Sequence, residues 1–441
     1  GIQNTIVGGL AGDALTTSNN NVAIGYQALT TDTLGTKTVA VGVDALKTQN
    51  FTTNTDTYNV AMGYHAGRDV TTGTENTLIG GLAGDALTTG TQNVAIGVNA
   101  LGSEDTSSYN VAIGREALKT QNGGQYNVAV GRTAGMLLTT GELNTFIGSL
   151  AGDAFTDADR NVALGYAALT SDTLGSRSTA LGYGALSVQN FSTATNSHNV
   201  AVGYNAAASL TTGLGNTIVG GLAADALTAS SNNIAIGQAA LSADTLGQQS
   251  VAIGVSALAT QNFTTATNSL NTAVGYLAGA AITTGTQNTL MGNAVGDVLS
   301  TGAENVAIGY GALSSATADG RNTAVGTLAL LVQNTSTNAA STAVGYLCGR
   351  NITTGIYSTL MGAFNGDALT DADYNTSIGF AALSSDTLGS KSTAIGYQAL
   401  ATQNFTTATN SLNTAVGNEA GAAVTTGTNN TLLGALCGDA I

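Results

Sequence analysis

The chain has 441 residues, of which 43% are apolar and only 8% are charged, and it contains 59 Gly but no Pro or Trp. A formal net charge of -15 at pH 7 argues against nucleic acid and anionic membrane surfaces as partners, because both repel an acidic chain. The apolar content is too high for a disordered chain, and no apolar run approaches the roughly 18 residues of a membrane helix. We therefore expect an ordered chain with no membrane insertion in this segment.

The pentapeptide from Asn21 to Gly25 is the unit on which the chain is built. Versions of it occur 25 times, usually with a 17-residue period, from Asn4 to Asn430. With its first residue numbered as position 1 of a coil, position 5 is Gly in all 25 copies and position 1 is Asn in 19. Position 2 is always Val, Thr or Ile, and position 4 is always Val, Ile, Leu or Met. Such repetition predicts a solenoid, which we interpret as one continuous module over residues 1–441.

Each pentapeptide predicts a short β-strand. The apolar residues at positions 2 and 4 alternate with Ala at position 3, so that large and small side chains face opposite sides. We expect the large side chains to stabilise the coil, and Asn at position 1 and Ala at position 3 to face neighbours, with the Asn amides forming a ladder. Gly at position 5 ends the strand, where a turn or a close neighbour leaves no room for a Cβ atom.

The coils follow a four-coil order. First coils carry a large residue at position 3 and Asp at position 10, such as Asp85. Second coils read like 161–175, which ends in Asp-Thr-Leu-Gly from Asp172, and fourth coils end in Thr-Thr-Gly, as at 71–73. Third coils contain Gln-Asn, usually followed by Phe, and four of the six are stretched to a 21-residue length, as in 38–58. Three 17-residue coils and one 21-residue coil give the 72-residue block that separates Asn4 from Asn76.

Units such as 21–29, Asn-Val-Ala-Ile-Gly-Tyr-Gln-Ala-Leu, and 271–279, Asn-Thr-Ala-Val-Gly-Tyr-Leu-Ala-Gly, resemble a known repeat. They resemble the YadA-like head repeats of trimeric autotransporter adhesins, and more closely the 17-residue repeats of bacteriophage tail fibre proteins. The resemblance implies an all-β, left-handed parallel β-roll with three chains to a fibre and the small face of the strands near the threefold axis. The longer coil and the four-coil order depart from adhesin heads. A single-chain parallel β-solenoid is the structural alternative to the homotrimer.

The sequence offers few groups for catalysis. Its only histidines, His65 and His198, lie in different blocks, and no Ser/His/Asp or Cys/His pair is supported. Cys348 and Cys437 both occupy position 8, where most coils carry Ala, so we interpret them as small apolar substitutes. Glycine pairs such as 80–81 are not followed by the helix start and Lys of a phosphate loop. We expect no catalytic residue, cofactor or metal, and therefore no enzyme.

The acids at position 10 of the first coils raise the question of calcium. They recur once per block and would lie roughly 19 Å apart at the spacing of stacked strands, too far to share an ion. We interpret them as solvated or turn-capping residues, with an ion site as the alternative. The seven residues are Asp13, Asp85, Asp153, Asp225, Asp297, Asp367 and Asp439.

The stretched third coils provide the candidate contact loops, which are Thr-rich and nearly identical. The simpler prediction is that the Phe at the start of each loop and the Tyr or Leu at its end tuck the loop against the coil. The alternative is a repeated ridge for a glycan or another partner. The loops are 51–58, 191–198, 263–270 and 405–412, and the candidate contact residues are Phe51, Asn54, Tyr58, Phe191, His198, Phe263 and Phe405. Asn50, Asn190, Asn262 and Asn404 each begin an N-glycosylation pattern.

Together these patterns predict a structural and adhesive extracellular fibre shaft. Our first hypothesis is a bacteriophage tail fibre that presents or contributes to host-surface binding. The alternative is a bacterial trimeric surface adhesin or a self-assembling extracellular filament. A glycan-cleaving tail spike is the hypothesis from a different class, and it requires acids clustered in a groove between chains. The expected partners are copies of the chain and a cell-surface glycan or protein receptor.

Overall fold

The computed structural model describes residues 1–438, which belong to two compact units, 1–216 and 217–441. Both units are built from the same coil, and every regular element in the described residues is a β-strand. Each coil contributes one short strand, at positions 2 to 4 of the repeat. The strands of the first unit are β1 (Thr5–Val7), β2 (Val22–Ile24), β4 (Val39–Val41), β6 (Val60–Met62), β7 (Thr77–Ile79), β8 (Val94–Ile96), β9 (Val111–Ile113), β10 (Val128–Val130), β11 (Thr145–Ile147), β12 (Val162–Leu164), β14 (Thr179–Leu181) and β16 (Val200–Val202).

The second unit continues the same series of strands. They are β17 (Thr217–Val219), β18 (Ile234–Ile236), β20 (Val251–Ile253), β22 (Thr272–Val274), β23 (Thr289–Met291), β24 (Val306–Ile308), β25 (Thr323–Val325), β26 (Thr342–Val344), β27 (Thr359–Met361), β28 (Thr376–Ile378), β30 (Thr393–Ile395), β32 (Thr414–Val416) and β33 (Thr431–Leu433). In four blocks, the second coil and the stretched third coil each add a two-residue strand, and these two strands pair. These pairs are β3 (Gly35–Thr36) with β5 (Thr55–Asp56), β13 (Gly175–Ser176) with β15 (Thr195–Asn196), β19 (Gly247–Gln248) with β21 (Thr267–Asn268), and β29 (Gly389–Ser390) with β31 (Thr409–Asn410).

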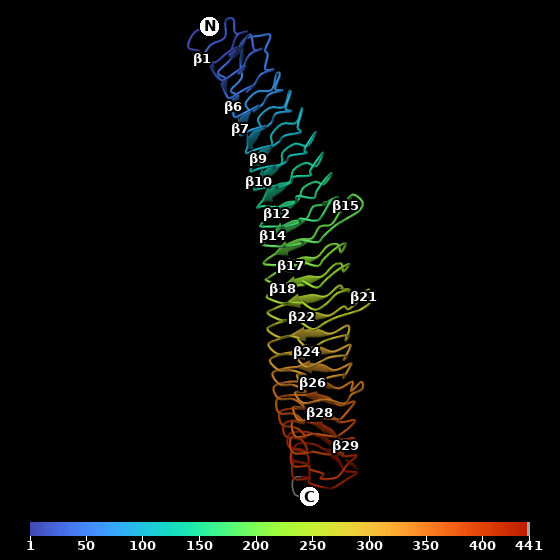
Figure 1. Cartoon of the computed structure of the whole chain (residues 1–441). Helices are drawn as coiled ribbons and strands as arrows, with labels where there is room; N and C mark the ends of the chain where they lie inside the picture. The colour runs from blue at the N-terminus through green and yellow to red at the C-terminus, as the bar shows by residue number, and fades with distance from the viewer. Residues whose placement is uncertain (439–441) are drawn as a thin grey trace. The chain divides into compact units, whose positions relative to one another are not determined.

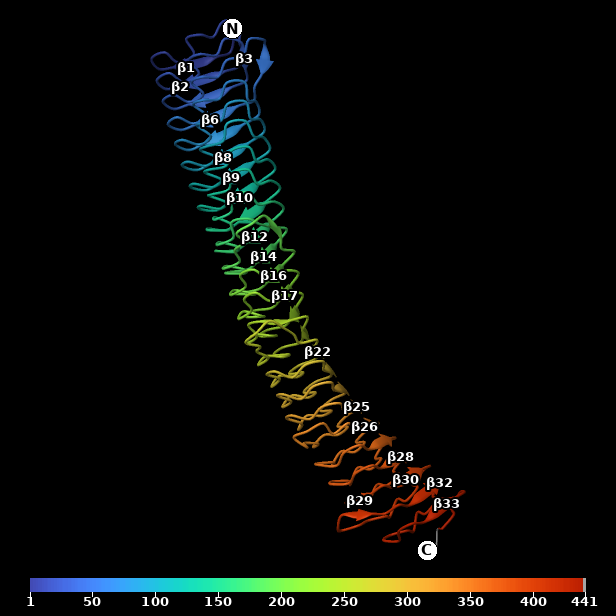
Figure 2. The same cartoon turned by 90° about the vertical axis from the view of Figure 1, so that its right-hand side faces the viewer.

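Within each unit, successive strands pair in parallel with equivalent repeat positions opposite one another. In the first unit, Val94 lies opposite Val111 and Ile96 opposite Ile113, and the other pairs follow the same rule. Figure 1 shows these strands stacked one per coil. Figure 2 shows β3 apart from the sheet that contains β1 and β2, because it belongs to a different side of the coil. The chain is therefore an all-β, parallel β-solenoid of about 25 turns with a spacing of about 17 residues, as predicted.

The glycine at position 5 is fixed by the neighbouring coil. Gly114 has a φ of +134°, and a Cβ atom placed on it would clash with the carbonyl oxygen of Gly131 in the next coil. Real Cβ atoms do not approach backbone atoms so closely, and this positive φ is also strained for any residue with a side chain. The close contact with the next coil and the positive φ recur at position 5 along the stack, which explains why this position is Gly in all 25 copies.

The large side chains at positions 2 and 4 were predicted to stabilise the coil, with Ala at position 3 facing neighbours. This prediction is wrong. In β8, Ala95 is fully buried, whereas Val94 and Ile96 on either side of it are only half-buried. The interior of a 17-residue coil is thin, so a methyl group fills the space beneath most strands. The Val and Ile side chains therefore point outward. The small face is enclosed by its own coil and cannot be the face near a threefold axis, contrary to what the resemblance implied.

The four-coil order arises from the way the core is filled. In most second and third coils, the core holds Ala at position 3 and Leu at position 9, such as the fully buried Leu101. In a first coil, Leu78 occupies position 3, and position 9 is Gly84 in that coil and Gly67 in the coil before. A Cβ atom on Gly67 would lie 2.6 Å from Leu78 Cδ1, and one on Gly84 would lie 2.8 Å from Leu78 Cδ2. One large side chain thus fills the space left by two missing leucines.

Candidate functional site

The candidate contact residues of the loops differ in how far they are buried. Phe51, Phe191, Phe263 and Phe405 are each only 6% exposed, so they tuck the loops against the coil as predicted. The residue that ends each loop does not, because Tyr58 is 53% exposed and His198 is also exposed. Asn54 lies at an exposed loop tip. Any contact role therefore falls to the loop tips and their last residues rather than to the phenylalanines. In Figure 1 the loop that carries β15 projects beyond the coils next to it.

A buried polar clamp holds each stretched loop. In the first block, Gln49 Nε2 donates to Asp32 Oδ2 at 2.6 Å and to Thr38 Oγ1 at 3.1 Å. Gln49 Oε1 accepts from Asn59 Nδ2 at 2.8 Å, and Asp32 Oδ1 accepts from the backbone N–H of Phe51 at 3.3 Å. All four clamp side chains are fully buried. The same contacts recur in Asp172–Gln189–Ser178–Asn199, Asp244–Gln261–Ser250–Asn271 and Asp386–Gln403–Ser392–Asn413.

The clamp explains why an acid is tolerated inside so thin a coil. Burial raises the pKa of Asp244, while hydrogen bonds from Gln261 and from backbone N–H groups oppose that rise. Hydrogen bonds to an ionised carboxylate are stronger than neutral ones, so the donors offset part of the cost of removing the charge from water. The clamp therefore ties the second coil, the third coil and the loop into one polar unit.

Sequence reasoning missed the clamp, although a signal was present. The block with a 17-residue third coil carries Glu104 in place of the clamp Asp, and the block with a 19-residue third coil carries Ala316 there. The Asp at position 12 and the 21-residue third coil thus occur together. The clamp partners belong to different coils, as Asp32 and Gln49 do, so the link becomes visible only when consecutive coils are compared.

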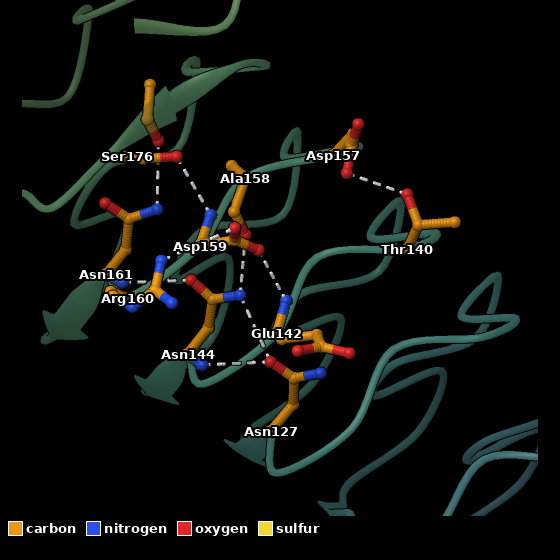
Figure 3. A network of polar contacts seen from close by, with 11 residues as sticks. Asn127, Thr140, Glu142, Asn144, Asp157, Ala158, Asp159, Arg160, Asn161 and Ser176 are labelled. Carbon is orange, nitrogen blue, oxygen red and sulfur yellow. Dashed lines mark hydrogen bonds and ion pairs between the residues drawn. The ribbon is translucent and has the colours of Figure 1, made fainter. Parts of the chain in front are cut away.

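An asparagine ladder joins the coils at position 1. Asn144 Nδ2 donates to the carbonyl oxygen of Ala158 at 2.7 Å, which closes its own coil, and Asn144 Oδ1 accepts from the backbone N–H of Asn161 at 2.9 Å. The N–H of Asn144 in turn donates to Asn127 Oδ1 at 2.9 Å (Figure 3). The predicted ladder is confirmed, but each side chain bonds mainly to backbone. Because these amides are fully buried, each one satisfies backbone groups that water cannot reach.

Carboxylates beside this ladder accept hydrogen bonds from the preceding coil and do not cluster with one another. Asp159 Oδ1 accepts from the N–H of Glu142 at 2.9 Å, and Asp157 Oδ1 accepts from Thr140 Oγ1 at 2.8 Å (Figure 3). The N–H of Asp159 donates to Ser176 Oγ at 3.0 Å. These carboxylates therefore act as caps of turns in the stack.

The last residue of every coil, immediately before position 1, forms what we call the corner row. Every member has a positive φ, between 50 and 65°, and all except Ala340 are exposed. The row contains charged, amide, aromatic and aliphatic residues but never Val, Ile or Thr, although these three are abundant elsewhere. A left-handed backbone is most strained for β-branched residues, which explains their exclusion. Tyr58, His198, Leu270 and Leu412 belong to this row, which is why they end their loops exposed.

Neighbouring members of the corner row contact one another. Tyr109 and Tyr126 stack with ring centroids 4.9 Å apart, and Arg321 Nε donates to Glu304 Oε2 at 2.9 Å. In the first block, Lys37 lies over the Tyr58 ring at 4.9 Å and forms an ion pair with Asp56 at 2.6 Å. That hydrogen bond from Lys37 lowers the pKa of Asp56. The row thus presents a continuous, chemically varied edge.

The outward side of the strands forms a second surface, which we call the sheet face. It consists of the side chains at positions 2, 4 and 6 of successive coils. Positions 2 and 4 carry no charged residue in any of the 25 coils. Position 6 adds tyrosines, and Tyr166, Tyr183 and Tyr204 stack with centroids 5.3 and 5.5 Å apart. Larger residues at position 4 stay open to solvent, as Met62 is 47% exposed and Leu164 is 45% exposed.

The remaining residues singled out from the sequence lie beside the sheet face or within the coil. His65 stacks on Tyr64 with centroids 3.7 Å apart, and its Nε2 lies 3.3 Å from Asp44 Oδ2, so it is only partly exposed. Cys348 is buried, and burial raises the pKa of its thiol to about 12, as expected for an inert Ala substitute. Cys437 is half-buried.

The acids at position 10 are partly buried in most blocks. Burial is the main cause of the raised pKa of Asp85, Asp153, Asp225, Asp297 and Asp367. Asp153 Oδ1 accepts from Thr170 Oγ1 at 2.6 Å. Asp439 lies outside the described residues. No group of three or more His, Cys, Asp or Glu side chains that could hold a metal ion occurs within residues 1–438.

No model of a known protein family matches the chain, and no curated protein is significantly similar to it. No helix able to cross a membrane is found among the residues that the structure describes.

Proposed function

We propose that this chain is the shaft of a homotrimeric extracellular fibre. The first assignment is a bacteriophage tail fibre, and the alternative is a bacterial trimeric surface adhesin or a self-assembling extracellular filament. The observation that carries the proposal is the sheet face. Positions 2 and 4 of this face lack charge in all 25 coils, although the chain contains 26 acidic and 11 basic residues. A long exposed surface without charge at these positions is typical of a face that contacts another chain.

The sheet face supports association of several chains along their whole length. Each coil exposes part of a Val, Thr or Ile at position 2, part of an aliphatic residue at position 4 and, in many coils, a Tyr at position 6. Burying the exposed half of one aliphatic side chain is worth roughly 1 kcal/mol, and this contribution repeats in every coil. Small contributions that recur in register favour lengthwise association, and the number three comes from the repeats that the chain resembles.

Contact with a cell surface is assigned to the corner row and the loop tips. Both are exposed. The loop tips recur nearly unchanged in four blocks, so a receptor with repeated glycan or protein epitopes would meet several equivalent loop sites, with the varied side chains of the corner row beside them. Tyr58, His198 and Asn54 are the members of these surfaces that were expected from the sequence. Tyrosine and arginine in the corner row are residue types that are enriched where proteins bind partners.

Sedimentation analysis of the purified chain tests the trimer. We expect a mass three times that of the 43.4 kDa chain. The Ile113→Glu variant places a charge on the sheet face and should lower the trimer fraction, whereas Thr193→Glu, at an exposed loop tip, should not. A wild-type mass of one chain would overturn the proposal.

Labelling with an antibody against the chain separates the two biological settings. Label on the tails of phage particles would support the tail fibre. Label on the bacterial cell envelope would support the adhesin or filament instead.

A further inference from the structure

The dipeptide Asn-Gly occurs twice in the chain, at Asn122–Gly123 and at Asn365–Gly366, in two contrasting environments. Asparagine followed by glycine is the pair most prone to spontaneous deamidation, because glycine leaves its own backbone nitrogen unhindered. The reaction also requires that the asparagine side chain be free to approach that nitrogen. The fold therefore decides which of the two pairs can react.

Asn122 lies in an open corner of the third coil that has no long loop. Its side chain is exposed, and a Cβ atom on Gly123 would meet only Thr140 Cγ2, at 3.8 Å. The five other third coils carry Asn at the same position but follow it with Phe or Thr, as at Asn50–Phe51. Bulk at the following residue hinders ring closure, so Asn122 is the one reactive member of this set.

Gly123 also faces a carboxylate. Its backbone N–H donates to Glu104 Oε1 at 3.4 Å, and Glu104 is fully buried. Burial raises the pKa of Glu104, which makes its carboxylate a stronger base than an exposed one. The nitrogen that must lose its proton is therefore the one that donates to this oxygen.

Asn365 is also followed by Gly, but its side chain is not free to approach the Gly366 nitrogen. Its side chain is fully buried, and Nδ2 donates to the carbonyl oxygen of Gly379 at 2.9 Å. The N–H of Gly366 donates to the carbonyl oxygen of Ala382 at 2.9 Å, and a Cβ on Gly366 would lie 2.8 Å from Leu369 Cδ1. Both hydrogen bonds must open before Asn365 can react.

We propose that Asn122 is a self-modifying site that deamidates through a succinimide, with the Glu104 carboxylate accepting the proton from Gly123. The Gly123 nitrogen attacks Asn122 Cγ, a new N–Cγ bond forms, and the Cγ–Nδ2 bond breaks to release ammonia. Water then opens the ring to give aspartate or isoaspartate. Each event adds one negative charge, and the isoaspartate product also lengthens the backbone at that corner by one atom.

Timed incubation at pH 7.4 and 37 °C, followed by peptide mass mapping and enzymatic isoaspartate methylation, tests the site. In the folded chain, Asn122 should react at least about 10-fold faster than Asn365, because two hydrogen bonds protect the latter. In urea the two sites should react at similar rates. Equal rates in the folded chain, or an intact Asn122 when the unfolded chain has reacted, would overturn the proposal.

The Glu104→Gln variant tests the role of the carboxylate. Glutamine keeps an oxygen acceptor at the same reach but is a much weaker base. The rate at Asn122 should fall in the folded variant and stay unchanged in urea, with the circular dichroism spectrum checking that the fold is intact. An unchanged rate in the folded variant would remove Glu104 from the proposal. A matched Gly123→Phe variant, which copies four of the other third coils, should slow the reaction strongly in both states.

Discussion

Replacing the glycine at position 5 should break the stack, and Gly80 with its neighbour Gly81 provides a matched test. Gly80 ends β7 with a φ of +133°, and a Cβ atom on it would lie 2.7 Å from both the carbonyl carbon and the carbonyl oxygen of Gly97. Gly81 has no positive φ, and its nearest contact would be Tyr64 O at 3.9 Å. Two adjacent glycines thus differ in whether the next coil leaves room for a methyl group.

The magnitude follows from two costs at Gly80. A strained backbone region costs about 1–3 kcal/mol, and relieving the clash requires β7 and β8 to move apart against their paired hydrogen bonds. We expect Gly80→Ala to destabilise the chain by at least about 3 kcal/mol. Gly81→Ala should change stability by less than about 1 kcal/mol in either direction, because alanine also reduces the freedom of the unfolded chain.

Urea unfolding of the full chain, together with hydrogen exchange of individual peptides, provides the readout. A repeat array need not unfold in one step, so local protection is the more direct measure. In Gly80→Ala, peptides that contain 77–79 and 94–96 should lose protection, while distant coils keep theirs. Equal protection in the two variants would refute the argument that the neighbouring backbone fixes position 5.

Phe146→Ala should cost about 3–5 kcal/mol in the unfolding free energy, because it empties the core beside Phe155, whose ring centroid is 5.5 Å away. Gln189→Leu should cost about 1–3 kcal/mol and expose the amides of 191–198 to exchange, because it leaves the buried carboxylate of Asp172 without its side-chain donor. Burial raises the pKa of Glu104 in the folded state, so its contribution to stability is present at acidic pH and is lost as pH rises through that pKa. The melting temperature of Glu104→Gln relative to the wild type should therefore rise between pH 4 and pH 7. Tyr109→Val should lower the melting temperature more than Tyr109→Asn, because a β-branched residue tolerates a φ of 65° least; equal effects would count against backbone strain as the selecting force.

The repeat and its strand were predictable because one backbone constraint acts in every coil. Gly114 and its equivalents are spaced regularly, and only a stack of similar coils demands glycine at that spacing. The direction of the strand faces was not predictable by the same route. Alternation separates Val94 and Ile96 from Ala95, but it does not say which side is inside. The volume available in a 17-residue coil decides that question, and the methyl group of Ala95 is what fits.

The clamp and the corner row were missed for different physical reasons. The clamp joins Asp32 to Gln49 across coils, so neither residue stands out within its own repeat. The side chains of the corner row vary from coil to coil, so the sequence shows no common residue at this position. The only sequence signal of the shared positive φ is the lack of β-branched residues. Of the candidate contact residues, Phe51 was expected to hold its loop and does so. Tyr58 was expected to help it and instead lies in the corner row.

In the corner row, the fold fixes the backbone conformation of each residue and leaves its side chain open to change. A residue there must accept one backbone conformation, but its side chain leaves the coil and takes no part in the core. Mutation can therefore rewrite the row one coil at a time, among most of the amino acids, at little cost in stability. A lineage that carries this scaffold could change the pattern it displays to its surroundings quickly while the shaft beneath it stays the same.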